Sequence, residues 1–104
     1  MIQITIKKNY QNNVTAIHVS GHARYAPVGK DIVCAAVSTL LQVVGYTLAE
    51  RDDGMVKLDF DTSGLGTVDI TNPSRESYLI TGVFENGARM LAEQYPDHVA
   101  LKVS

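Results

Sequence analysis

The strongest constraint on the fold is a change in hydrophobic spacing that occurs twice along the chain. Two short segments alternate apolar and polar residues, which is typical of half-buried strands, and a longer segment with apolar residues at helical spacing follows. The same order then repeats, and one more alternating segment ends the chain. The predicted strands are residues 2–6, 14–20, 56–60, 68–70 and 99–103, and the predicted helices are residues 32–50 and 73–95.

This order predicts an α+β fold of the type β-β-α-β-β-α-β, a sandwich in which a five-stranded sheet carries two helices on one face. The helix at residues 32–50 is apolar around most of its circumference, so we expect the sheet on one side of it and a helix or a partner on the other. A chain of 104 residues can bury one core but not two, and we expect residues 1–104 to form a single domain.

The ends of both helices carry recognisable signals. Asp31 is a good N-cap for the first helix because its carboxylate can accept bonds from unpaired backbone N–H groups. Pro73 suits the first position of the second helix. The predicted buried stripe of the second helix consists of Ile80, Val83, Phe84, Gly87, Leu91 and Tyr95.

Composition and charge exclude several classes of function. The formal net charge is −2 and the basic residues are dispersed, which argues against direct binding of nucleic acid. We find no apolar run approaching the roughly 18 residues of a spanning helix, and no signal peptide, so we expect a cytoplasmic protein without a membrane role. The single cysteine cannot form an internal disulfide and suits a reducing compartment.

The candidate chemistry lies at residues 21–40, where periodicity stops for about ten residues before the first helix. His22 stands at the end of a strand, and Cys34 stands in the first turn of the helix. Unpaired N–H groups and the positive end of the helix dipole favour a thiolate there, and can also bind an oxyanion. Asp31 opposes thiol ionisation by its charge while its capping bond holds the turn.

Each of these residues also has an ordinary structural interpretation. A free cysteine in an apolar run usually packs in the core, and a histidine after a strand often only bonds a loop. Ser38 either contacts the site or bonds back to the preceding helical turn. Gly21 and Gly29 act either as hinges or as turn residues with positive φ.

The remaining histidines, His18 and His98, are interpreted as ordinary strand residues. Neither stands near a second carboxylate or cysteine at metal-ligand spacing, so we predict no metal site. No glycine-rich phosphate loop is present, and we expect no cofactor.

Residues 21–40, GHARYAPVGKDIVCAAVSTL, resemble the ribosomal-processing cysteine protease family, called Prp. Its members carry GHA, a glycine-containing loop and DIVCAAVS at this spacing, and the chain length and the order of elements fit as well. The resemblance implies that Cys34 is the nucleophile, that His22 completes a dyad and that Asp31 supports the site. Gly21, Gly29 and Ser38 match motif positions without an assigned role.

The resemblance also implies a function. The family removes the short N-terminal extension of a large-subunit ribosomal protein, the one numbered twenty-seven, during ribosome maturation. We therefore expect a cysteine endopeptidase that acts on a peptide as a homodimer. Two alternatives stay open: a non-catalytic ribosome-assembly module in which Cys34 only packs, and a thiol redox sensor, which would lack a resolving cysteine.

Overall fold

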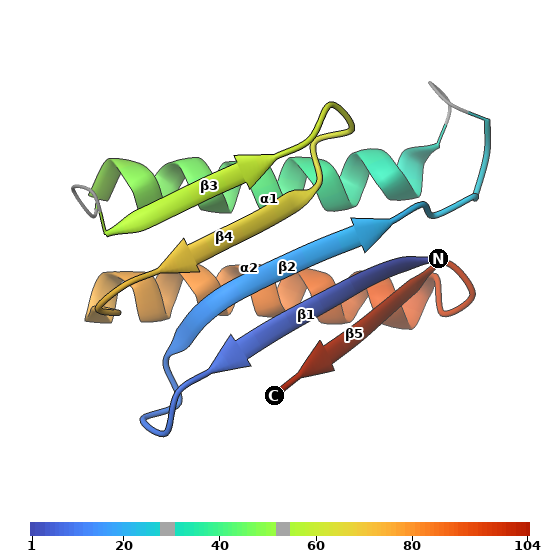
Figure 1. Ribbon diagram of the computed structural model, residues 1–104. Coiled ribbons are helices and arrows are strands. Elements are labelled where there is room, and N and C mark those ends of the chain that lie inside the picture. Colours follow the sequence, from blue (N-terminus) through green and yellow to red (C-terminus); the bar gives the residue numbers. More distant parts are fainter. Residues whose placement is uncertain (28–30, 52–54) are drawn as a thin grey trace.

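The computed structural model describes residues 1–27, 31–51 and 55–104, and its elements follow the predicted order (Figure 1). The ends of the strands and helices differ from the predicted ends by only a few residues. Hydrophobic periodicity therefore predicted every element correctly. The strands are β1 (Ile2–Lys8), β2 (Val14–Gly21), β3 (Val56–Phe60), β4 (Gly66–Ile70) and β5 (Val99–Val103), and the helices are α1 (Ile32–Arg51) and α2 (Arg75–Gln94).

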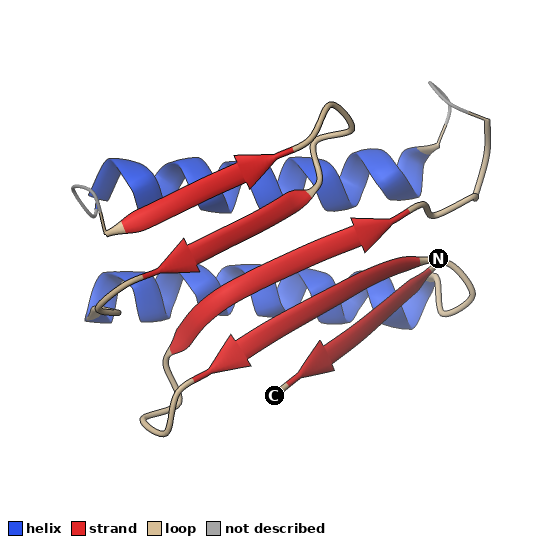
Figure 2. Ribbon diagram, in the orientation of Figure 1, coloured by secondary structure: helices blue, strands red, loops and turns tan. Residues whose placement is uncertain are grey.

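The strands form one sheet in the order β3-β4-β2-β1-β5, and both helices cover the same face of it (Figure 2). Strands β1 and β5 run parallel, whereas the other neighbours are antiparallel. In β1 the side chains of Ile2, Ile4 and Ile6 are buried beneath the helices, and the residues between them point to the other face. The predicted fold class is confirmed.

Helix α1 carries much of the core. Its buried residues follow helical spacing and face the sheet; they are Val33, Val37, Leu41, Val44, Gly45 and Leu48. The expectation that the chain lacks a long apolar run is wrong, since the helix has no charged residue before Glu50 and most of its residues are apolar. By length and composition alone α1 is able to cross a bilayer, yet a core helix of a soluble domain meets the same criterion.

Helix α2 differs from the prediction at its start and on its buried face. Its N-cap is Ser74 rather than the expected start at Pro73, because the serine hydroxyl accepts the N–H of Ser77, a bond that proline has no group to make. Val83, predicted to be buried, is 62% exposed. Thr81 faces the core instead, and it can do so because its hydroxyl donates to the carbonyl of Ser77.

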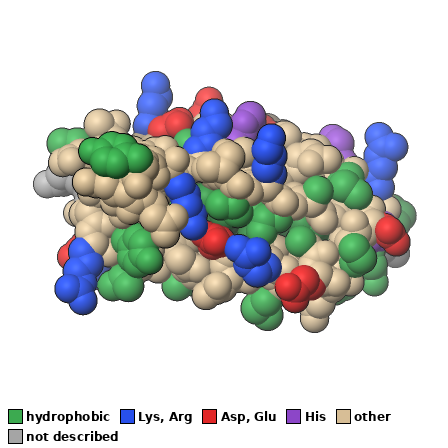
Figure 3. Space-filling model, turned by 90° about the horizontal axis from the view of Figure 1, so that it is seen from below, with side chains coloured by type: hydrophobic (Ala, Val, Ile, Leu, Met, Phe, Trp, Pro, Cys, Tyr) green, Lys and Arg blue, Asp and Glu red, His purple; other side chains and the backbone are tan. Residues whose placement is uncertain are grey.

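The underside of the molecule mixes charge types. In Figure 3 basic, acidic and apolar side chains alternate over this face, with no concentration of lysine and arginine. A surface of this kind offers no extended positive patch for phosphate groups.

Candidate active site

The start of α1 is organised by Asp31. Its main-chain carbonyl accepts the N–H of Ala35 at 3.1 Å, and its Oδ1 accepts the N–H of Cys34 at 2.9 Å. Asp31 is therefore the N-cap, as predicted, and Cys34 occupies the third helical position.

The second carboxylate oxygen of Asp31 reaches the segment that follows β2. Its Oδ2 accepts the N–H of Tyr25 at 3.1 Å. One carboxylate thus links the helix turn that carries Cys34 to the segment that carries His22. The capping role was foreseen from the sequence, whereas this link between two segments was not.

Cys34 and His22 both line a cavity of about 750 Å³ at this end of the molecule. Its walls come from three segments: the chain after β2, the first two turns of α1, and the β3–β4 turn. The lining residues are His22, Ala23, Arg24, Ala26, Pro27, Asp31, Ile32, Cys34, Ala35, Ser38 and Ser63. The thiol is half-buried, so it is not merely packed in the core.

The β3–β4 turn is the wall that sequence reasoning missed. Asp61 Oδ1 accepts the N–H of Ser63 at 2.8 Å and that of Leu65 at 3.3 Å. Gly64, with φ +84°, lies so close to Gln42 of α1 that an added Cβ would collide with its side chain. The turn residues were recognisable in the sequence, but their approach to α1 is a tertiary contact without a local signal.

The pKa of the Cys34 thiol is raised above its ordinary value. Partial burial is the largest cause, and the carboxylates of Asp31 and Asp61 add to it because a second negative charge nearby disfavours thiolate. The expectation of a thiol made acidic by the helix start is therefore wrong for this conformation. Burial of the thiol and the two nearby carboxylates both favour its protonated form.

The pKa of Asp31 moves the other way. Its slight burial favours the neutral acid, but bonds from the N–H groups of Cys34, Tyr25, Ala26 and Val33 outweigh this and lower the pKa. The hydrogen bonds to Asp31 also bear on the expected oxyanion site. The N–H groups of Cys34 and Ala35 already donate to Asp31, so they are not available to a substrate oxygen here.

The other predicted residues have simpler outcomes. Gly21 ends β2 with a φ of +95°, which agrees with its interpretation as a turn residue with positive φ. The hydroxyl of Ser38 donates to the carbonyl of Ala35 at 3.3 Å, and the residue also lines the cavity, so both of its interpretations hold. Gly29 lies outside the described residues. His18 is an exposed strand residue as predicted, but His98 precedes β5 and bonds the chain after β2.

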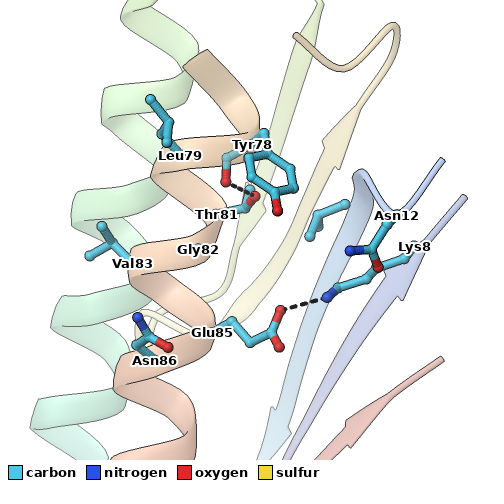
Figure 4. Close-up of a pocket in the computed structure, with 10 residues that line it drawn as sticks. Lys8, Asn12, Tyr78, Leu79, Thr81, Gly82, Val83, Glu85 and Asn86 are labelled. Carbon is cyan, nitrogen blue, oxygen red and sulfur yellow. Dashed lines mark hydrogen bonds and ion pairs between the residues drawn. The ribbon is translucent and has the colours of Figure 1, made fainter. Parts of the chain in front are cut away.

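A second hollow, of about 370 Å³, lies between the β1–β2 hairpin and α2 (Figure 4). Lys8 and Glu85 form an ion pair of 2.9 Å across it, which is the largest cause of the lowered pKa of Glu85. Neither Cys34 nor His22 lines this hollow. Within residues 1–27, 31–51 and 55–104, no group of three metal-ligating side chains is close enough to hold an ion.

Comparison with known proteins decides the class of chemistry. A model of the family described as cysteine protease Prp matches residues 1–100. The chain belongs to the Prp family. It is therefore a cysteine-type endopeptidase of the ribosomal processing cysteine protease family, which favours the protease over the binding module and the redox sensor.

Relatives of known name and structure cover nearly the whole length of the chain. The ribosomal processing cysteine protease Prp of Staphylococcus aureus is 30% identical over 110 residues, covering 97% of each chain. The protein of the same name from Mycoplasma genitalium is 29% identical, covering 97% of this chain and 94% of its own. Prp of Staphylococcus aureus, crystallised with a covalently linked product peptide, superimposes with a TM-score of 0.90 at 24% identity over both full chains.

A solved structure from Streptococcus mutans superimposes with a TM-score of 0.81 at 31% identity, covering 99% of this chain and 93% of the other. The arrangement of five strands and two helices is thus the one found in Prp structures.

Proposed function

We propose that this endopeptidase removes the short N-terminal extension of the large-subunit ribosomal protein numbered twenty-seven, with Cys34 as nucleophile and His22 as its acid–base partner. One observation carries the assignment: the only cysteine of the chain lies in the first turn of α1 and lines the same cavity as His22. A cysteine protease needs a reactive thiol, and this chain offers one.

The proposed reaction begins with a protonated thiol, because the pKa of Cys34 is raised. His22 accepts the thiol proton as the sulfur attacks the scissile carbonyl, which forms a tetrahedral oxyanion. The oxyanion collapses, the C–N bond breaks, and the histidine returns the proton to the leaving amine. Water, deprotonated by His22, then attacks the thioester, which releases the new carboxylate and regenerates the thiol.

The substrate class is supported by the relatives. Their name is ribosomal processing cysteine protease, and Prp of Staphylococcus aureus has been crystallised with a substrate peptide and with a covalently linked product peptide. A cavity of about 750 Å³ beside Cys34 has room for several side chains of an extended peptide. We place the enzyme in the cytoplasm, where ribosomal proteins are assembled.

The test is cleavage of a synthetic peptide that spans the N-terminal extension of that ribosomal protein from the same organism, read by mass spectrometry. We expect the unaltered enzyme to cut it, Cys34→Ala and His22→Ala to leave it intact, and His18→Ala, altered at an exposed strand histidine, to cut it normally. An intact peptide with the unaltered enzyme would refute the substrate, and cleavage by His22→Ala at the normal rate would refute the dyad.

We further propose that the enzyme is a homodimer that buries the outer sides of its helices. Each helix has an apolar stripe on its exposed side, at spacings that place its members on one face. The stripe residues, each between 54% and 62% exposed, are Ile32, Val43 and Tyr46 on α1 and Leu79, Val83 and Met90 on α2. Two stripes side by side favour a second copy as partner, since the same surface then covers itself.

Light scattering coupled to gel filtration tests the dimer. We expect a dimer for the unaltered protein and a monomer for Val43→Glu with Val83→Glu, whereas Lys7→Glu, altered on the opposite face of the sheet, stays dimeric. A monomeric unaltered protein at micromolar concentration would overturn the proposal.

A further inference from the structure

The segment that carries His22 contacts the connection between α2 and β5. His98 Nδ1 lies 2.8 Å from the carbonyl oxygen of Ala23, a contact between residues 75 positions apart in the sequence. A carbonyl oxygen can only accept a hydrogen bond, so we assign the proton to Nδ1 of His98. Both the neutral Nδ1–H tautomer and the imidazolium can donate this bond. Ala23 is 2% exposed. Without His98, its buried carbonyl would therefore lose its hydrogen-bond donor where little water can replace it.

His98 is itself well anchored. Its N–H donates to the carbonyl of Tyr95 at 2.9 Å, and its carbonyl accepts the N–H of Ile2 at 2.8 Å. The main chain of this residue is thus tied both to the end of α2 and to the first strand. The imidazole projects from a fixed base, which is what a positioning group requires.

Tyr25 completes the contact. Its ring packs edge-on against Tyr95, with centroids 5.5 Å apart, and edge-on against His98, at 5.3 Å. These are favourable aromatic geometries. The N–H of the same tyrosine donates to Asp31, the cap beside Cys34. Tyr25 therefore contacts the α2–β5 connection through its ring and the cap beside Cys34 through its N–H.

His22 lies between two fixed points. On one side Gly21 pairs with Ile2 in the sheet, and on the other Ala23 is bonded to His98. We propose that His98 is a positioning residue, which holds the main chain of Ala23 and thereby places His22 for proton transfer with Cys34. This inference rests on the proposed dyad and adds a residue that does not line the cavity.

Two substitutions separate the hydrogen bond from the ring contact. His98→Phe keeps an aromatic ring against Tyr25 but loses the donor. His98→Asn loses the ring. Its side-chain nitrogen is two covalent bonds from Cβ, as Nδ1 of histidine is, and can still donate to the carbonyl of Ala23. His18→Asn is the matched control on an exposed strand position.

The readout is the rate of Cys34 alkylation by iodoacetamide as a function of pH, which needs no identified substrate. The ionisable side chains near the thiol, Asp31, Asp61, His22 and Arg24, are unchanged in the single His98 variants. We expect His98→Phe to lower the rate near neutral pH by about tenfold, in the same direction as His22→Ala, because small displacements of a catalytic group are costly. His98→Asn should recover most of the rate, and thermal melting should confirm that each variant folds.

The double variant decides whether His98 acts through His22. If it does, adding His98→Phe to His22→Ala changes nothing further. An additive loss in the double variant, or a His98→Phe profile equal to the unaltered one while His22→Ala is shifted, would overturn the positioning role and leave the dyad standing. A His22→Ala profile equal to the unaltered one would overturn the dyad, and the positioning role with it.

Discussion

The two helices of this protein begin in nearly the same way and are used differently. Asp31 caps α1 and Ser74 caps α2, and the third helical positions are Cys34 and Ser77. The Ser77 hydroxyl accepts the N–H of Ser74, and this bond completes a capping box. Ser77 is only 1% exposed. Cys34 opens onto a cavity. The same backbone position is thus structural in one half of the chain and open to solvent in the other.

The difference arises from the caps and from what surrounds them. A serine cap has one short hydroxyl that serves its own helix, whereas the Asp31 carboxylate also reaches Tyr25. The chain that leads into α1 is long and bears polar side chains, and the one that leads into α2 is short. An enzyme site needs such a second segment, because a nucleophile without a positioned base is slow.

The largest expected effect comes from truncating the side chain at each third helical position. Cys34→Ala should lower peptide cleavage by about a thousandfold or more, because the covalent step is lost, and should leave thermal stability nearly unchanged. Ser77→Ala should retain cleavage but lose the capping box, which costs about 1 kcal/mol of unfolding free energy. Cleavage assays and urea unfolding of both variants check this pair; loss of cleavage in Ser77→Ala without unfolding would contradict the comparison.

A smaller effect is expected when the start of α1 is made like that of α2. Asp31→Ser keeps a good N-cap, so the free energy of unfolding should change by less than about 0.5 kcal/mol. The short hydroxyl cannot reach both Cys34 and Tyr25, so cleavage should fall by roughly tenfold to a hundredfold. The reverse change, Ser74→Asp, is the control and should leave cleavage as it is. Equal cleavage by both variants would show that the link through Asp31 is dispensable.

The charge beside the thiol gives a third prediction. Asp61→Asn keeps the oxygen that holds the β3–β4 turn but removes a negative charge that raises the pKa of Cys34. The thiol pKa should therefore fall, and the alkylation rate at pH 7.5 should rise by roughly twofold, less so at high salt. Asp69→Asn, on an exposed position of β4, should have no effect. Slower alkylation of Cys34 in Asp61→Asn than in the unaltered protein would refute the electrostatic explanation.

The smallest effect is a difference in acid sensitivity between the two caps. The pKa of Asp31 is lowered by folding, so its bonds stabilise the protein fully above the ordinary range of an aspartate, and this contribution is lost as pH falls through the lowered pKa. The Ser74 cap does not titrate. Melting curves from pH 7 down to pH 2.5 should show that the unaltered protein loses more stability than Asp31→Ser at the acid end; parallel curves would contradict the assignment.

Local pattern was enough to predict most of the fold, and it singled out His22 and Cys34, which line one cavity in the structure. The order of elements, the cap at Asp31 and the pair His22 and Cys34 follow from alternating and helical spacing, and from a motif within 20 consecutive residues. Contacts across the chain were not predictable in this way. The expected burial of Val83 was wrong because a helical stripe fixes which residues share a face, and packing then chooses which face is covered.

The sequence by itself determined the strand and helix order, the single thiol and the family motif, because these depend on spacing along the chain. Only the tertiary structure decided the raised pKa of Cys34, the wall made by Ser63 and the bond from His98 to Ala23. Each of these brings together residues from different elements. Burial, charge and hydrogen bonding act through space, and the distances that set them exist only once the helices have packed on the sheet.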